Sequence, residues 1–371
     1  MDLLLAELKY SDGWQLDIKE YIEEYSEIIW TTRWNACGDF VLTVPSDSFK
    51  TISDYKELIN KIIINKSATD NIGSAVPDDY MIIEKITLTY DVTLNQMLMI
   101  EGRNLLSILE RRIIWGQQSF RSSQTLKSAC DIMVNNAIIS PSDSNRKIDA
   151  FKIGTYSASR TIEASQVSYD NLLDTLIDVC GDDYSPKVIL DGGYFIFSLY
   201  QGTDKTINSN DPMIFSQRLE NLEKYEYIKD VSTFKNAWLC AGDGEGAQRK
   251  RQSNYWNSGT DEEKGIGLYR RELYIDARNI SSEDSSGTIP TATYNKMLLQ
   301  CIEDKRLKTW IEELSTAELN FGDKKYGKDY SVGDRASLVD SVGVVHTIRI
   351  TEFIRCASKE GYKEYPNFEL L

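Results

Sequence analysis

The stretch Phe234-Lys-Asn-Ala-Trp-Leu-Cys-Ala-Gly242 predicts a β-strand, because apolar and aromatic residues dominate it and a glycine ends it. A loop rich in glycine and charge follows at residues 243–251. A second ordered block then runs Gly267-Leu-Tyr-Arg-Arg-Glu-Leu-Tyr-Ile-Asp-Ala-Arg-Asn279. This order of strand, flexible loop and structured block is the most specific pattern in the chain.

Residues 1–101, toward the N-terminus, predict a β-rich region. Short runs of β-branched and aromatic residues alternate with Gly, Asn, Asp and Pro, and Pro45 stops one of the strands. Residues 80–90 and 97–101 predict a hairpin. The predicted strands are 3–8, 28–33, 39–44, 61–65, 80–90 and 96–101. Many short strands at this spacing favour a small barrel or sandwich.

The spacing of apolar residues becomes helical after residue 103. Helices are predicted at 104–112, at 125–139 with Ser122 or Ser123 as N-cap, and at 169–180 with Gly181 as C-cap. A hairpin follows, with strands at 187–190 and 194–200. We therefore expect residues 104–225 to form an α+β insertion between β regions.

The chain becomes β-rich again from residue 225 to 241. Residues 243–266 form the best candidate for disorder, and residues 293–319 carry the longest helical pattern. One face of that pattern is apolar: Met297, Leu298, Cys301, Ile302, Leu307, Ile311 and Leu314. Strands are predicted at 336–339, 344–356 and 363–371. Residues 80–88 and 345–353 suggest an internal repeat, although any two hairpins alternate similarly.

Composition describes an ordinary folded protein. The chain has 371 residues, 41% hydrophobic and 27% charged, which suggests two to four domains. Its net charge of −15 argues against stable nucleic-acid binding, which needs a basic face. The acidity favours solubility, or alternatively an electronegative wall along which DNA slides.

The six cysteines are scattered without a CxxC pair, so we expect reduced, mostly buried thiols in a protein made in cytoplasm. The opening Met1-Asp-Leu-Leu-Leu-Ala-Glu lacks the basic region of a signal peptide. No run reaches the roughly 18 apolar residues that span a bilayer. We therefore expect no membrane span.

Residues able to carry chemistry are few, and we expect no catalytic, cofactor-binding or metal site. The only histidine, His346, lies within a predicted strand and cannot form a triad or a zinc site alone. The glycine-rich stretch 242–246 lacks the pattern of a phosphate-binding loop. Acidic pairs stand at Asp182-Asp183, Glu262-Glu263 and Glu312-Glu313, and calcium candidates at 142–145, Asp204 and 208–211, without DxDxDG spacing. The basic cluster 249–251 predicts a solvated loop, or contact with an acidic neighbouring subunit.

The ordered pieces together resemble one protein family, the gene-product-37-like proteins of siphoviruses. That family has a "KN…V.G.G…R" segment followed by "RRE.Y.DAR". The matching residues here are Lys235-Asn236, Gly242, Gly244, Arg249 and Arg270-Arg271-Glu272-Leu273-Tyr274-Ile275-Asp276-Ala277-Arg278. Further matching pieces are Trp30, Trp34, Gly38-Asp39-Phe40 and Pro45; Met81-Ile-Ile-Glu84; Ile100-Glu-Gly-Arg103; residues 105–115; Tyr330-Ser-Val-Gly-Asp334; and Ile348-Arg-Ile350 with Glu352.

The resemblance implies a tail-hub fold, α+β but mainly β, with two β-barrel-like tube domains that carry insertions. Tube domain I would be 1–103, the α+β insertion 104–225, tube domain II 226–242 plus 316–371, and the insertion with the flexible loop and long helix 243–315. Three copies would then form a ring of six tube domains. Such a homotrimer adapts a six-fold tail tube to a three-fold tip.

The implied function is a structural hub of the tail tip or baseplate, through whose polar, negative lumen DNA passes during ejection. Expected partners are the distal tail and tail tube proteins and a distal tip, fibre or spike protein. We expect the protein in the virion tail tip, assembled in the cytoplasm of the host bacterium. The chain stops straight after the hub pattern, so no enzymatic domain is expected. The alternatives are a carbohydrate-binding adhesion module and an enzyme that degrades cell wall.

Overall fold

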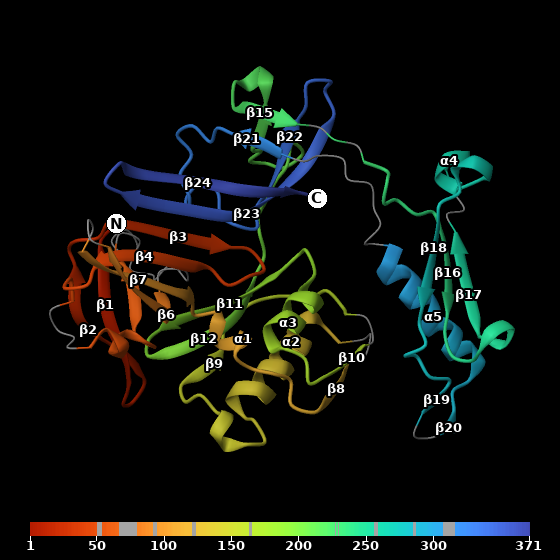
Figure 1. The fold of residues 1–371 in the computed structure, drawn as a ribbon, viewed down its shortest axis with the longest axis horizontal. Helices are drawn as coiled ribbons and strands as arrows, with labels where there is room; N and C mark the ends of the chain where they lie inside the picture. Colours follow the sequence, from red (N-terminus) through yellow and green to blue (C-terminus); the bar gives the residue numbers. More distant parts are fainter. Residues whose placement is uncertain are drawn as a thin grey trace. The chain divides into compact units, whose positions relative to one another are not determined.

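The computed structural model describes residues 1–49, 54–66, 80–91, 95–120, 124–162, 165–226, 228, 230–255, 259–284, 287–306 and 316–371. It divides into two compact units (Figure 1). Unit 1 contains Met1–Leu219 and Phe321–Leu371, and unit 2 contains Glu220–Asn320. Each unit has its own sheets and is described by itself.

Unit 1 is built on a 12-stranded sheet of order β13-β22-β23-β3-β4-β7-β6-β5-β1-β2, with β14 beside β22 and β24 beside β23. Its strands are β1 (Leu3–Tyr10), β2 (Trp14–Ile22), β3 (Glu27–Arg33), β4 (Asp39–Pro45), β5 (Ile62–Asn65), β6 (Tyr80–Asp91), β7 (Asn95–Asn104), β13 (Asp204–Lys205), β14 (Ile214–Ser216), β22 (Arg335–Val339), β23 (Val345–Ser358) and β24 (Gly361–Leu370). The two predicted β regions therefore lie in one sheet, joined where β23 pairs antiparallel with β3.

The sheet of unit 1 is covered on both faces around β1, β5 and β6. Leu3 and Leu5 of β1 belong to one apolar core, whereas Leu4 and Ala6 belong to another. Successive side chains of a strand point to opposite faces, so both faces of this strand are buried. The core that contains Leu4 and Ala6 also contains the buried side chains of the α+β block. The predicted hairpin of β6 and β7 is confirmed.

The α+β block contains α1 (Ser107–Glu110), α2 (Leu126–Val134), α3 (Leu172–Cys180), β8 (Gln117–Phe120), β9 (Phe151–Ile153), β10 (Ser165–Ser168), β11 (Ser185–Asp191) and β12 (Tyr194–Tyr200). The predicted hairpin of β11 and β12 and the helix ending at Gly181 are confirmed. The N-cap of α2 is Thr125, whose hydroxyl accepts from the Ser128 N–H. The predicted caps Ser122 and Ser123 lie outside the described residues.

Two three-stranded meanders in unit 1 share a register. In β5-β6-β7, the pairing of β6 with β5 ends at Ile82, and a bulge in β6 follows directly after Ile83. In β22-β23-β24, the pairing of β23 with β22 ends at Arg349, and a bulge follows directly after Ile350. Bulges are designed features of strands, so their matching positions are informative. The two meanders therefore align on their bulges, with a shift of two residues from the repeat predicted from the sequence.

The described residues of unit 2 form three small sheets and two α-helices. Strands β15 (Leu222–Glu226) and β21 (Thr316–Leu319) form a two-stranded ribbon, and β16 (Ala237–Ala241) lies between β17 (Arg251–Tyr255) and β18 (Glu272–Asp276). The remaining elements are α4 (Asp261–Lys264), β19 (Glu283–Asp284), β20 (Gly287–Thr288) and α5 (Thr291–Arg306). The core of this unit contains Trp238, Cys240, Ile275, Tyr294, Leu298 and Ile302.

The structure divides the chain differently from the prediction that grouped 226–242 with 316–371. Both edges of β16 are occupied by β17 and β18, so β16 belongs to unit 2, whereas β22, β23 and β24 belong to unit 1. The predicted loop 243–266 contains the strand β17, whose polar residues alternate along the edge of that sheet.

The predicted helix 293–319 also differs from the structure. α5 is described as far as Arg306, and residues 316–319 form a strand because β15 supplies their backbone partners. Leu298 and Ile302 are fully buried as predicted, whereas Met297 is exposed. Leu307, Ile311 and Leu314 lie outside the described residues.

Candidate functional site

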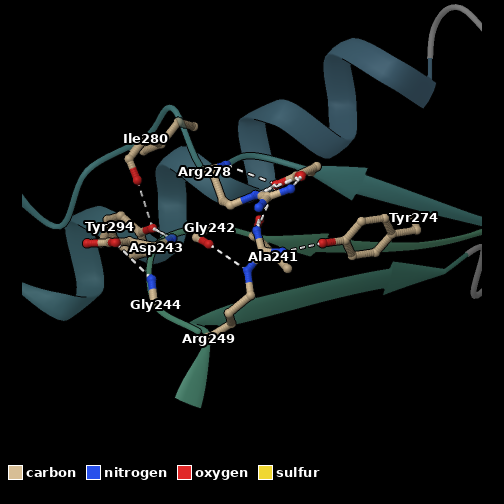
Figure 2. A network of polar contacts seen from close by, with 10 residues as sticks. Ala241, Gly242, Asp243, Gly244, Arg249, Tyr274, Arg278, Ile280 and Tyr294 are labelled. Carbon is tan, nitrogen blue, oxygen red and sulfur yellow. Dashed lines mark hydrogen bonds and ion pairs between the residues drawn. The ribbon is translucent and has the colours of Figure 1, made fainter. Parts of the chain in front are cut away.

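The segments singled out in the sequence meet around the guanidinium of Arg249, at the end of the sheet in unit 2 (Figure 2). Arg249 donates to the carbonyl oxygens of Ala241 (2.5 Å) and Gly242 (2.9 Å), where β16 ends. It also donates to the Asp276 carboxylate (2.8 Å) and the Tyr274 hydroxyl (2.5 Å) of β18. One side chain thus fastens the loop after β16 to two strands, with the planar fork of donors that only arginine offers.

Asp276 is the acidic centre of this network. It accepts from Arg278 (2.5 and 2.9 Å) and from Arg249, and these hydrogen bonds hold the pKa of its carboxyl well below the usual range. These hydrogen bonds favour the ionised carboxylate, which joins the two arginines to β18.

Tyr294 of α5 closes the other side of the glycine-rich turn. Its side chain is fully buried, and its hydroxyl accepts from the Asp243 N–H (2.6 Å) and donates to the Ile280 carbonyl (2.9 Å). A Cβ on Gly242 would lie 2.0 Å from that hydroxyl, so only glycine fits there. The glycine-rich stretch therefore packs on a tyrosine.

Asn236 joins the first motif segment to the second. It is fully buried, accepts from the Arg271 N–H (2.8 Å) and donates to the Tyr269 carbonyl (2.9 Å). A Cβ on Gly265 would lie 2.5 Å from the Asn236 amide oxygen. Satisfied buried amides of this kind fix one chain path, because an unpaired polar group in a core is costly.

The motif residues of unit 1 also form joints. Glu84 of β6 accepts from Arg103 of β7 (2.6 and 3.2 Å) and from Arg111 (2.6 Å). Burial raises the pKa of the Glu84 carboxyl, but hydrogen bonds from the two arginines outweigh it, and the net pKa is lowered. Glu84 and its two arginines hold the β6-β7 hairpin together at its bulge.

The Trp34 ring lies against Gly333, where a Cβ would approach a ring carbon to 2.2 Å. The neighbouring Asp334 is buried and accepts from the N–H groups of Thr203 (2.7 Å) and Ser331 (2.8 Å). Burial raises the pKa of its carboxyl against these hydrogen bonds. These contacts tie segments that are distant in the sequence into the large sheet.

A family model of the Siphovirus ReqiPepy6 Gp37-like proteins matches residues 10–365, which is nearly the whole chain. The chain belongs to this family. The resemblance found in the sequence is thereby confirmed. The chain matches none of the curated proteins with which it was compared.

The Gp37-like chain also resembles solved tail proteins. The 43 kDa tail protein of prophage MuSo2 from Shewanella oneidensis shares 15% identity, over 100% of this chain and 98% of that one, with a TM-score of 0.51. A tail protein from Neisseria meningitidis MC58 shares 10% identity, over 100% and 97%, at 0.48. The prophage tail protein gp18 from Listeria monocytogenes EGD-e shares 13%, over 95% and 90%, at 0.47.

At such low identity, the likeness to the Shewanella protein concerns the fold alone. The expected fold class, α+β but mainly β, is confirmed for this Gp37-like chain.

His346, the only histidine of this Gp37-like chain, has a side chain that is 10% exposed. Its Nε2 lies 3.3 Å from the Asp340 carboxylate, across the turn between β22 and β23. Asp340 also accepts from the N–H groups of Val342 and Val344 and so closes that turn. The pair is engaged in local structure, and no nucleophile of the described chain is shown beside it.

The structure does not bring the acidic candidates together into a site. Asp182 lies 3.8 Å from Arg349, and Asp183 lies 3.8 Å from Arg160. The side chains of Glu262-Glu263 and the pair Glu312-Glu313 lie outside the described residues. Asp204 caps its own turn at Thr206.

Metal-ligating clusters of three or more His, Cys, Asp or Glu side chains are not found in the described parts of the Gp37-like chain. All six cysteines are free thiols, of which Cys130, Cys180 and Cys240 are buried. None of the helices within the described ranges is long and apolar enough to cross a membrane.

Two residues of the site were not understood from the sequence. Arg249 was predicted to lie in a solvated basic cluster, yet its side chain is mostly buried and bonded to two strands. Its place in the Gp37-like motif was the only signal. Tyr294 carried no signal, because a tyrosine on an amphipathic helix looks like any other core residue.

Proposed function

We propose that the chain is a structural hub subunit of a phage or phage-like tail tip, and that three copies form a ring that adapts the six-fold tail tube to the three-fold tip. The observation that carries this proposal is the doubled meander: β5-β6-β7 and β22-β23-β24 share one register in one sheet. A chain with two related meanders supplies six meanders to a three-fold ring, which matches the six-fold symmetry of the tube.

The proposed ring binds distal tail and tail tube proteins on one side and a tip, fibre or spike protein on the other. The net charge of −15 suits a lumen that repels passing DNA. The chain performs no catalysis in this proposal, because the motif residues hold strands and turns together. It resides in the virion tail tip after assembly in the host cytoplasm.

The proposal is tested by the mass of the purified protein, measured by light scattering on a size-exclusion column over a concentration series. We expect a trimer of three times 42.3 kDa, and class averages from electron microscopy that show a ring with an open centre. Immunogold labelling of assembled tails should place the protein at the tip.

A strict monomer at every concentration, absent from the tail tip in labelled tails, contradicts the hub. Binding of that monomer to a glycan array would then favour the adhesion module, whose exposed aromatic side chains would stack on sugars. A trimer found at the tip that also leaves host cell walls intact in a turbidity assay supports a hub without enzymatic activity.

A further inference from the structure

The shared register of the two meanders exposes a difference between them. Residues 352–358 of β23 have β24 on one edge and β3 on the other. By the bulge positions, residues 85–91 of β6 are their counterpart. Within the described part of the chain, this half of β6 pairs with β7 alone, so its second edge carries no strand.

The side chains agree with this difference. Ala357 of β23 is 6% exposed, whereas its counterpart Tyr90 of β6 is 71% exposed. Leu88, the counterpart of Arg355, is 38% exposed. An edge with apolar side chains and unpaired backbone groups is a template for another strand, and proteins normally protect such edges. In β23 the equivalent edge, at residues 352–358, is protected by the antiparallel strand β3.

The chain also contains a strand suited to this edge. The ribbon of β3 and β4 comes before the first meander in the sequence, and residues 46–61 connect the two. The ribbon of β15 and β21 comes before the second meander, and residues 320–334 connect those two. β15 is therefore the counterpart of β3. A two-stranded ribbon is marginal by itself in water and gains stability when a third strand joins it.

We propose that residues 85–91 of β6 pair antiparallel with β15 of a second copy of this chain, as residues 352–358 of β23 pair with β3 of their own chain. This pairing rests on the proposed ring and names its joint. Donor and acceptor strands differ, so the contact is head-to-tail and closes when the rotation between copies fits a ring.

The register of the joint follows from the ends of the two ribbons. The first pair of the β3-β4 ribbon is Glu27 with Thr43, and the first pair of the β15-β21 ribbon is Leu222 with Leu319. Trp30, three residues after Glu27, faces Arg355 of β23, the counterpart of Leu88. Tyr225 lies three residues after Leu222 and is therefore the counterpart of Trp30. Leu88 of one copy thus faces Tyr225 of the next.

Disulfide formation tests this register in the full chain. We expect the double variant Leu88→Cys/Tyr225→Cys to form covalent dimers and trimers under mild oxidation. Each single variant, and the pair Leu88→Cys/Tyr255→Cys with the second cysteine elsewhere in unit 2, should not. The single variants also control for the native cysteines.

A trimer that cross-links no more than the single variants overturns the joint and leaves the hub standing. A protein that stays monomeric and does not cross-link at any concentration overturns both. Leu88→Lys supplies a second measurement, because a lysine on the edge opposes pairing, and it should weaken association about tenfold. Ile132→Lys is the matched control, since Ile132 of α2 is 37% exposed. Equal association of the two variants would also refute the pairing.

Discussion

Replacing Tyr294 with phenylalanine isolates the buried hydroxyl that closes the glycine-rich turn. The ring remains, so no cavity opens, but the Asp243 N–H and the Ile280 carbonyl lose their partner. Each buried polar group left unsatisfied costs about 1–3 kcal/mol, partly offset because phenylalanine is more apolar. We expect a net loss of about 2 kcal/mol, which shifts the melting temperature of a domain of this size by about 8 °C or more.

The change is measured by thermal unfolding and by hydrogen exchange of the amides in β16 and β18. Amides that exchange through unfolding of unit 2 should exchange about 30-fold faster in Tyr294→Phe, as about 2 kcal/mol implies. The matched control is Tyr274→Phe, which removes the hydroxyl of a residue that is 53% exposed and should change stability by less than about 0.5 kcal/mol. Equal small effects of the two variants would refute the role of the Tyr294 hydroxyl.

Three further predictions concern other joints. Gly333→Ala should destabilise unit 1 by about 2 kcal/mol or more and alter the near-UV circular dichroism of Trp34, because the new Cβ would overlap the indole ring. Gly343→Ala is the control, since Gly343 has a similar positive φ but open space around its Cβ position. Equal losses of stability in the two variants would exclude the overlap as the cause. The pKa of Glu84 is lowered in the folded state, so the ionised carboxylate stabilises the fold above its ordinary pKa, and this stabilisation is lost as pH falls through the lowered pKa. Glu84→Gln should therefore make the free energy of unfolding fall less steeply in acid. A pH profile from urea unfolding that is the same in both proteins would contradict this. Arg249→Lys keeps the charge but loses the fork of donors, so it should raise protease cleavage in the 243–251 turn. Arg251→Lys, at an exposed residue, should not, and equal cleavage of the two variants would argue against the clamp.

Local patterns predicted part of the fold correctly. The hairpin of β6 and β7 followed from alternation and a short connection, and the end of α3 followed from Gly181, which adopts a positive φ of 58°. Such features depend on residues close in the sequence, so one segment contains the information. The family motif likewise identified the residues that meet around Arg249.

Long-range pairing could not be predicted. β16 pairs in parallel with β18, and this choice of partner depends on tertiary packing, so local patterns did not indicate it. The role of Arg249 needed the positions of the Ala241 and Gly242 carbonyls, and those positions exist only in the folded sheet. Charge in a glycine-rich stretch looks solvated until such acceptors are known.

The pairing of β3 with β23 sets an order of events during synthesis. Arg33 bonds to Glu352, a partner 319 residues further along the chain. At about 5–20 residues per second, the ribosome needs roughly 15 to 60 s to make the strand that covers β3. During this interval the edge of β3 that later pairs with β23 has no partner strand. Contacts of such high sequence separation also form slowly. We therefore expect a chain truncated before β23 to aggregate, because the edge of β3 then has no partner strand.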